Sequence, residues 1–97
     1  MQGHGEFKMP GGKLVVADLA IADDALAQVA ISGDFFLEPD SALDAINAAL
    51  TGLSRHSDAE AMAVAVQAGL PKGTAMYGVS PDAIAVAVRR AIDGAGA

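Results

Sequence analysis

Two short stretches decide the fold of this chain. They are Lys8-Met9-Pro10-Gly11-Gly12-Lys13-Leu14-Val15 and, eighteen residues after Val15, Gly33-Asp34-Phe35-Phe36-Leu37-Glu38-Pro39. In the first stretch, proline and a glycine pair favour a tight turn between two extended segments. In the second, a Gly-Asp corner precedes two of the three phenylalanines in the protein. The first stretch therefore predicts a hairpin, and the second marks the point where strand patterning ends.

The first third of the chain has strand patterning on both sides of the hairpin turn. Residues 6–9 alternate polar and apolar side chains, and residues 13–21 carry β-branched residues in a second alternation of Val15, Ala17, Leu19 and Ile21. Asp23-Asp24 marks the next turn. Residues 26–32 follow as a third strand, with Val29 and Ile31 on one face and Gln28, Ala30 and Ser32 on the other. Connections this short predict an antiparallel meander.

After Gly33 the hydrophobic period becomes helical. A first helix is predicted from Pro39 to Leu50 or Leu53, because apolar residues recur there at helical spacing. A second helix over 58–68 is indicated by Ser57 as N-cap with a glutamate three positions later, and by Gly69 as a left-handed residue after its end. Ser80-Pro81-Asp82 begins a third helix, which ends at Gly94 and carries the stripe Ile84, Val88 and Ile92. Residues 75–77 suit a short extended piece.

Strands followed by helices predict a single α+β domain over residues 1–97. We expect a three-stranded antiparallel β-meander with about three helices packed on one face, and flexible ends at 1–4 and 94–97. The apolar run 61–66 surrounds its helix more fully than a one-sided stripe would, so we expect a second face of that helix to be covered, for example by another subunit. The predicted core comprises Leu14 or Val16, with Val29, Ile31, Leu43, Ile46, Ile84 and Val88.

Composition excludes several classes of function. The formal net charge of −6 opposes binding to nucleic acid or to an anionic membrane surface, because both are polyanions. The chain has no cysteine, which excludes disulfides, thiol nucleophiles and sulfur-carrier chemistry. Its first twelve residues contain no apolar segment typical of a signal peptide, and its longest apolar run is far below the ~20 residues that span a bilayer. We therefore expect a cytoplasmic protein.

Lys13 is the main candidate for chemistry at the hairpin. A phosphate-binding P-loop needs a glycine five residues before the Gly-Lys pair and Ser or Thr after the lysine, but Phe7 and Leu14 occupy those places. Two interpretations remain open. Lys13 is either a solvated lysine at the head of a strand or a point charge directed at an anionic ligand or an acidic partner surface.

The other polar residues favour structural interpretations. His4 and His56 have no second histidine or cysteine at metal-ligand spacing, so we interpret both as surface histidines and predict no metal site. The acidic pair Asp23-Asp24 suits a turn, and the acidic residues near position 58 suit the first turn of a helix. We predict no catalytic residue. Phe35 and Phe36 point in opposite directions if the backbone is extended, so we expect one in the core and one exposed as an interface anchor.

Together the two opening stretches resemble the carboxy-terminal accessory domain of lipoate-protein ligases, as a free-standing subunit. The resemblance covers roughly residues 5–49 and becomes thinner afterwards, where helix order and Gly78-Val79-Ser80-Pro81 remain. Its matched positions are Lys8, Pro10, Gly11, Gly12, Lys13, Leu14, Gly33, Asp34, Phe35, Phe36 and Pro39. Of these, Lys8, Lys13, Phe35 and Phe36 are the candidate contacts to a partner or ligand, and the prolines, glycines and Asp34 are a structural motif.

The resemblance implies a role in lipoylation. Such ligases activate lipoate with ATP to lipoyl-adenylate and pass the lipoyl group to a lysine of an acyl-carrier domain. Their large domain holds the lipoate pocket, the ATP contacts and the catalytic lysine, and the small domain packs against it. No residue of that catalytic site has a counterpart here, so lipoate and ATP with Mg²⁺ would bind in a complex with a catalytic subunit.

The resemblance also implies a fold similar to iron-sulfur scaffold and sulfur-acceptor proteins, whose chemistry needs the cysteine that this chain lacks. Two hypotheses remain. The first is a non-catalytic accessory subunit of a two-part lipoate-protein ligase, with lipoyl-acceptor domains as indirect partners. The second is a stand-alone, non-enzymatic module that self-associates or holds an unrelated protein or small ligand.

Overall fold

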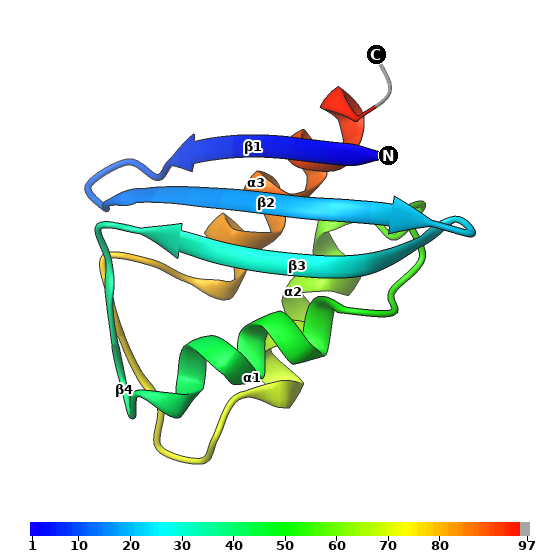
Figure 1. The fold of residues 1–97 in the computed structure, drawn as a ribbon. Coiled ribbons are helices and arrows are strands. Elements are labelled where there is room, and N and C mark those ends of the chain that lie inside the picture. Colours follow the sequence, from blue (N-terminus) through cyan, green and yellow to red (C-terminus); the bar gives the residue numbers. More distant parts are fainter. Residues whose placement is uncertain (96–97) are drawn as a thin grey trace.

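The three predicted strands form one antiparallel sheet in the order β1-β2-β3. The computed structural model describes residues 1–95, and its first strands are β1 (Gln2–Lys8), β2 (Leu14–Ala22) and β3 (Ala25–Gly33) (Figure 1). β1 begins at Gln2 rather than at residue 6, because its glycine-containing first half pairs with β2 as far as Gln2 opposite Ala20. Residues 2–4, which were expected to be a flexible end, are therefore strand residues.

The inward face of β2 confirms the predicted alternation, and it corrects one part of the predicted core. Val15, Ala17, Leu19 and Ile21 are all buried. Leu14 and Val16, one of which was expected in the core, are only partly buried. Successive strand residues face opposite sides of a sheet, so burial of Val15 directs both neighbours to the other face.

A β-bulge turns Leu26 of β3 inward, although strict alternation from the buried Ile31 would direct it outward. The register shifts between Ala20 and Ile21, so Leu19 lies opposite Val29 while Ile21 lies opposite Leu26. The extra residue reverses the alternation, and both Leu26 and Ile31 are buried. Val29 is partly buried against the same core.

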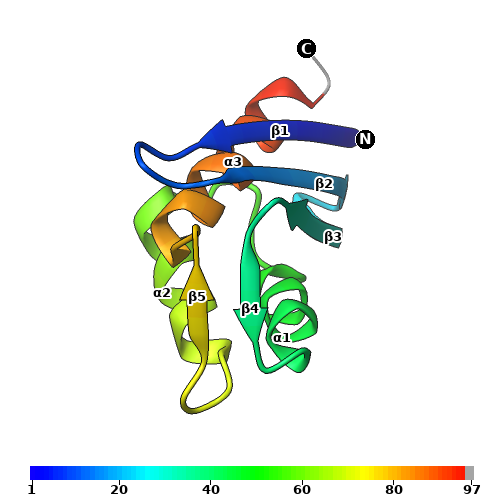
Figure 2. The same cartoon turned by 90° about the vertical axis from the view of Figure 1, so that its left-hand side faces the viewer.

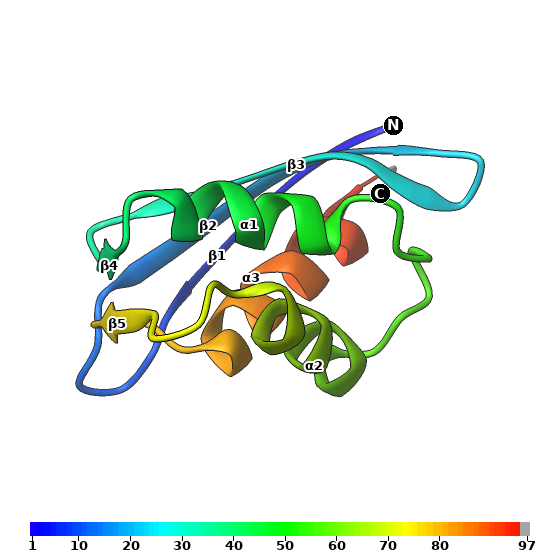
Figure 3. The same cartoon turned by 90° about the horizontal axis from the view of Figure 1, so that it is seen from below.

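Three helices cover one face of this sheet, which confirms the predicted α+β class (Figures 1 and 3). They are α1 (Ser41–Leu50), α2 (Ala59–Gly69) and α3 (Pro81–Gly94). α3 packs against β1 and β2, α1 packs against β3, and α2 lies against the two other helices. No residue from 1 to 95 forms a second layer over the opposite, open face of the sheet. No helix among residues 1–95 has the length and apolar character needed to cross a bilayer.

The helix ends agree with the sequence at α3 and differ at α1 and α2. Ser80 caps α3 as predicted, its hydroxyl accepting from the amide of Ala83 at 3.1 Å. α1 begins at Ser41, two residues later than expected, after Pro39 has ended the preceding strand segment. α2 is capped by Asp58 rather than Ser57, since the Asp58 carboxylate accepts from the amide of Ala61 at 2.8 Å. Asp58 and Ser57 are both good cap residues, so sequence alone could not separate them.

Gly69 is a packing glycine rather than the predicted left-handed residue. It is the last residue of α2, and Leu70 follows in extended conformation. A Cβ on Gly69 would lie 2.8 Å from the Cβ of Ala49 in α1. The absence of a side chain lets α1 and α2 approach one another.

The closest approach in the core joins β1 to α3. A Cβ on the buried Gly5 would overlap the carbonyl oxygen of Ala87 and the amide nitrogen of Ala91. A Cβ on Gly3 would overlap the carbonyl oxygen of Ala91. Glycine on the strand and alanine on the helix therefore let the backbones of β1 and α3 come together, and Figure 1 shows α3 crossing behind β1 and β2.

The core is wholly apolar, with no buried polar or charged residue among residues 1–95. Four predicted core residues are confirmed as buried, namely Ile31, Ile46, Ile84 and Val88, while Leu43 is partly buried. In α2, Met62 and Val66 are fully buried, but Val64 is 63% exposed. The proposed cover over the second face of α2 therefore stays a prediction.

A small second sheet completes the fold. β4 (Phe36–Glu38) pairs antiparallel with β5 (Ala75–Tyr77), which confirms the expected extended piece at 75–77 and adds a partner strand that was not predicted. The cis Glu38–Pro39 bond follows β4 and leads into α1. At the other end of the chain, Ala95 is buried, and residues 96 and 97 of the predicted flexible tail lie outside the described residues.

Candidate functional site at the hairpin end

The two stretches quoted first meet at one end of the molecule, which Figure 2 views directly. We call this region the hairpin end and define it as residues 8–13, 33–36 and 77–78. The turn between β1 and β2 is closed by the amide of Gly12, which donates to the carbonyl of Met9 at 2.9 Å. The amide of Lys13 donates to the carbonyl of Gly78 at 2.9 Å and joins the turn to the end of β5.

The segment after β3 is tied to the same end. The amide of Asp34 donates to the carbonyl of Leu14 at 3.2 Å. Gly33 has φ +150°, and a Cβ there would overlap the Leu14 carbonyl oxygen and lie 3.0 Å from the ring of Phe35. Only glycine permits this approach without displacing the strand.

Gly78 is the corresponding glycine on β5's side. It has φ +80°, and a Cβ there would lie 2.6 Å from Cγ of Lys13. The aliphatic part of Lys13 therefore rests on the Gly78 backbone. This contact joins residues that are 65 positions apart and fixes the first part of the Lys13 side chain against the backbone.

The two adjacent phenylalanines differ in exposure, as expected. Phe35 is partly buried against the core, and Phe36 is 56% exposed. Phe36 lies opposite Tyr77 in the β4–β5 ladder, and the two rings form a tilted pair with centroids 5.9 Å apart. Tyr77 was not a predicted site residue, although it is the only tyrosine of the chain and lies in the suspected extended piece. The long-range pairing that makes it a partner of Phe36 leaves no local signal.

Lys8 and Lys13 are both exposed at this end, at the last residue of β1 and just before β2. Neither forms an ion pair within residues 1–95. The fold thus brings together all four candidate contact residues, Lys8, Lys13, Phe35 and Phe36, and presents three of them to solvent.

The remaining motif positions have structural contacts or lie in turns. Gly11 has φ +72° and stands free at the tip of the turn beside the exposed Pro10. The carbonyl of Pro39 accepts from the amide of Ala42 at 2.9 Å in the first turn of α1. Asp34 is exposed beside the aromatic segment.

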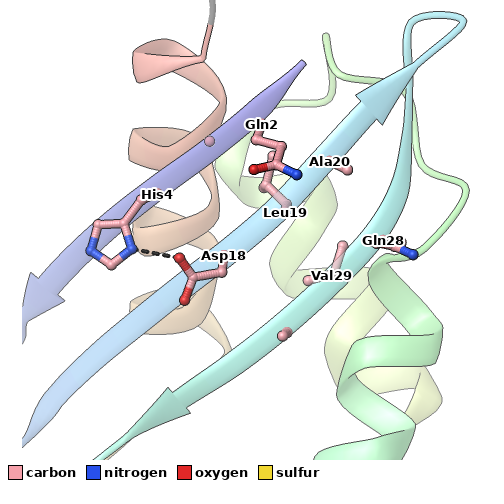
Figure 4. Close-up of a pocket in the computed structure, with 9 residues that line it drawn as sticks. Gln2, His4, Asp18, Leu19, Ala20, Gln28 and Val29 are labelled. Carbon is pink, nitrogen blue, oxygen red and sulfur yellow. Dashed lines mark hydrogen bonds and ion pairs between the residues drawn. The ribbon is translucent and has the colours of Figure 1, made fainter.

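A second feature lies on the open face of the sheet, away from the motif residues. His4 is half exposed, and one of its ring nitrogens lies 2.6 Å from an Asp18 carboxylate oxygen (Figure 4). Its other ring nitrogen lies 2.7 Å from a Glu6 carboxylate oxygen. Hydrogen bonds to Asp18 and then to Glu6 raise the pKa of His4 above its ordinary value of 6.5. The predicted surface position of His4 is confirmed.

His4 and Asp18 border an open depression of about 550 Å³ over the outer surface of the sheet. Small and polar residues from all three strands line it, including Gln2, Ala20, Gln28 and Ala30 (Figure 4). Within residues 1–95, no group of three or more histidine, cysteine or acidic side chains could hold a metal ion. His56, the other histidine, is exposed in the loop before α2. The open face carries His4 and Asp18 at the edge of this depression, with Glu6 bonded to His4. The hairpin end instead combines aromatic rings with lysines that form no ion pair within residues 1–95.

Comparison with solved structures finds one likeness over almost the whole chain. It is to a chain in a study of an archaeal lipoylation system, described as a bipartite lipoate protein ligase and its E2 lipoyl domain from Thermoplasma acidophilum. The TM-score is 0.74 and the sequence identity 24%, and the alignment covers 92% of this chain and 96% of that one. At this identity the likeness shows a shared fold. Neither a scan of protein-family models nor a search of curated proteins finds a match.

Proposed function

We propose that this chain is the non-catalytic accessory subunit of a two-part lipoate-protein ligase, required by a separate catalytic subunit for ATP-dependent formation of lipoyl-adenylate. The observation that carries this proposal is the whole-chain likeness to a component of a bipartite ligase system. Because the alignment covers nearly all of both chains, the two are of similar length. A component this small corresponds to an accessory part better than to a domain that binds lipoate and ATP.

The hairpin end supplies independent support. The residues on which the sequence resembles the accessory domain lie in two separate stretches, and the hydrogen bond from the amide of Asp34 to the carbonyl of Leu14 joins them in the fold. Lys13 is tied in addition to Gly78, at the end of β5. A motif needed only for local turns would not have to present two exposed lysines and an exposed phenylalanine together. This arrangement favours an intermolecular role over folding alone.

In the proposed complex, lipoate and ATP with Mg²⁺ bind to the catalytic subunit, and this chain acts by docking. Docking would order a nucleotide site that the catalytic subunit does not hold closed by itself. This chain would bind the closed state of that subunit more tightly than the open state and so shift the equilibrium toward closure. Lys13 would act as a point charge toward the nucleotide or toward an acidic partner surface. The acceptors are lipoyl domains, which this chain serves indirectly, in the cytoplasm.

A pyrophosphate-release assay tests the proposal. This chain alone with lipoate, ATP and Mg²⁺ should release no pyrophosphate, and a separately encoded catalytic subunit lacking its own small domain should release little. Mixed, the two should co-purify and release pyrophosphate at least about tenfold faster. Preformed lipoyl-adenylate should bypass much of the requirement for this chain in lipoyl transfer. Equal adenylation with and without this chain, or no association, would contradict the accessory role.

One observation favours a second candidate, a stand-alone module that self-associates. Phe36 and Tyr77 are both more than half exposed, and an exposed aromatic pair is a feature of many interfaces between identical chains. Sedimentation of the isolated protein separates the two functions. A stable homodimer with no affinity for a ligase catalytic subunit would support the module.

A further inference from the structure

We infer that the catalytic subunit docks on the aromatic pair Phe36–Tyr77 with Lys13 beside it, and that the matching surface on that subunit is an apolar pocket bordered by carboxylates. This inference rests on the proposed function and adds to it the contact surface and the chemistry of the partner. We call Phe36, Tyr77 and Lys13 the docking patch.

Exposure and mutual contact identify the two rings as the anchor. The large hydrophobic side chains exposed by more than half among residues 1–95 are Met1, Phe36, Val64 and Tyr77. Met1 is at the chain end and Val64 projects from α2, whereas Phe36 and Tyr77 contact each other at a ring distance of 5.9 Å. Aromatic side chains in a cluster supply large contact area at a small cost in side-chain entropy, and they dominate binding energy at interfaces.

The patch is held in place before any partner arrives. In the β4–β5 ladder, Leu37 lies opposite Met76, and both are partly buried against the core. Alternation along the two strands then directs Phe36 and Tyr77 away from it. The backbone hydrogen bond from Lys13 to Gly78 fixes the turn next to Tyr77. Preorganisation lowers the entropic cost of binding, so a small patch of this kind can act as a docking site.

The distribution of cations indicates the charge of the partner. The arginines are used within the chain. Arg89 donates to the carbonyls of Arg55 and Ser57, and Arg90 donates to the carbonyl of Glu6 and lies over the Phe7 ring. Arg55 lies 4.0 Å from a carboxylate oxygen of Asp24.

Lys8 and Lys13, in contrast, form no ion pair within residues 1–95. Within the residues that define the hairpin end only Asp34 carries an opposite charge, and Glu38 follows on the exposed side of β4. This end is therefore weakly basic in a protein of formal charge −6. A carboxylate-bordered partner gains from both lysines. A second copy of this chain would instead bring the same lysines and the same net negative charge together, so charge favours a different protein as the occupant.

Binding of the catalytic subunit to four variants tests the patch. The double variant Phe36→Ala/Tyr77→Ala should raise the dissociation constant about tenfold to a hundredfold. It should also reduce pyrophosphate release when this chain is present at subsaturating concentration. Val64→Ala removes a comparably exposed apolar side chain from α2 and tests the separate prediction of a cover over that helix. If the catalytic subunit docks on the aromatic pair, this variant should change neither value by more than about twofold. Lys13→Glu should weaken binding by about tenfold or more, and the control Lys72→Glu, an exposed lysine in the loop between α2 and β5, should not.

Each outcome separates the inference from the function on which it rests. If wild-type protein fails to bind or activate the catalytic subunit, the proposed function fails. If wild-type protein activates it and the double variant binds equally well, with its circular dichroism unchanged, the function stands and the docking patch is wrong. Loss of a homodimer in the double variant, without loss of ligase binding, would assign the patch to a second copy and would also overturn the inference. If a higher salt concentration narrows the difference in affinity between Lys13→Glu and wild type, this result supports carboxylates on the partner surface next to Lys13.

Discussion

The interface of β1 with α3 and the hairpin end both depend on glycine, with opposite results. At the first, Gly5 lies against the backbone of Ala87 and Ala91, and both alanines are fully buried. At the second, Gly78 lies against the side chain of Lys13, and the surrounding lysines and rings are exposed. Close backbone approach stabilises the fold in one region, and in the other it positions groups that the fold does not itself use.

The largest expected loss of stability comes from truncating a buried core side chain, and truncation of an exposed ring at the hairpin end is the comparison. Ile46 is fully buried, and Ile46→Ala should lower the free energy of unfolding by about 2 to 5 kcal/mol. Phe36→Ala should cost at most about 1 kcal/mol, because the ring is more than half exposed and loses mainly its contact with Tyr77. Urea denaturation of both variants measures the difference. A loss below about 0.5 kcal/mol for Ile46→Ala would remove it from the core.

The next effect concerns Gly5, the glycine of β1 that packs against α3. Gly5→Ala places a methyl group against two backbone atoms that cannot move independently of the helix, and it should cost about 2 to 3 kcal/mol. Gly94→Ala is the matched control, since its added Cβ would meet only ordinary contact at 3.9 Å, and alanine favours a helix over glycine. Its effect should be neutral or slightly stabilising. Equal melting temperatures for the two variants would show that β1 and α3 are not closely packed.

The glycine at the hairpin end should be less critical for stability. Gly78→Ala forces a side chain into φ +80° and displaces Cγ of Lys13, which is flexible, so we expect a cost of about 1 to 2 kcal/mol. Because the change also moves Lys13 and Tyr77, binding to the ligase catalytic subunit should weaken while the protein stays folded. Thermal unfolding and binding titrations on the same sample make the comparison. A loss of stability as large as that of Gly5→Ala would contradict the distinction between the two regions.

The smallest effect is expected on the outward side of β1. The raised pKa of His4 means that the folded state favours its protonated form. The stabilising contribution of His4 should therefore be complete below pH 6.5 and should disappear as the pH rises through the folded-state pKa. NMR titration should show His4 with a pKa above 6.5, and Asp18→Asn should lower it. His4→Gln should remove the small pH dependence of the melting temperature without affecting binding at the hairpin end. A wild-type pKa of 6.5 or below would show that the carboxylates do not hold the charge.

Local sequence determined much of this protein. Alternation and turn residues predicted three antiparallel strands, and helical periodicity with the Ser80-Pro81 start predicted α3 correctly. The opposite orientations of Phe35 and Phe36 also follow from local geometry, because adjacent residues of an extended chain face opposite sides. These properties depend on residues a few positions apart, so a short window of sequence contains the information.

Tertiary structure alone decided the rest. The bulge opposite Ala20–Ile21 turned Leu26 inward, packing against α1 gave Gly69 its role, and pairing across 41 positions joined Phe36 to Tyr77. Whether a residue is a cap, a packing glycine or half of an aromatic pair depends on which distant backbone lies beside it. Packing of the helices and sheet sets that proximity, and no local pattern encodes it.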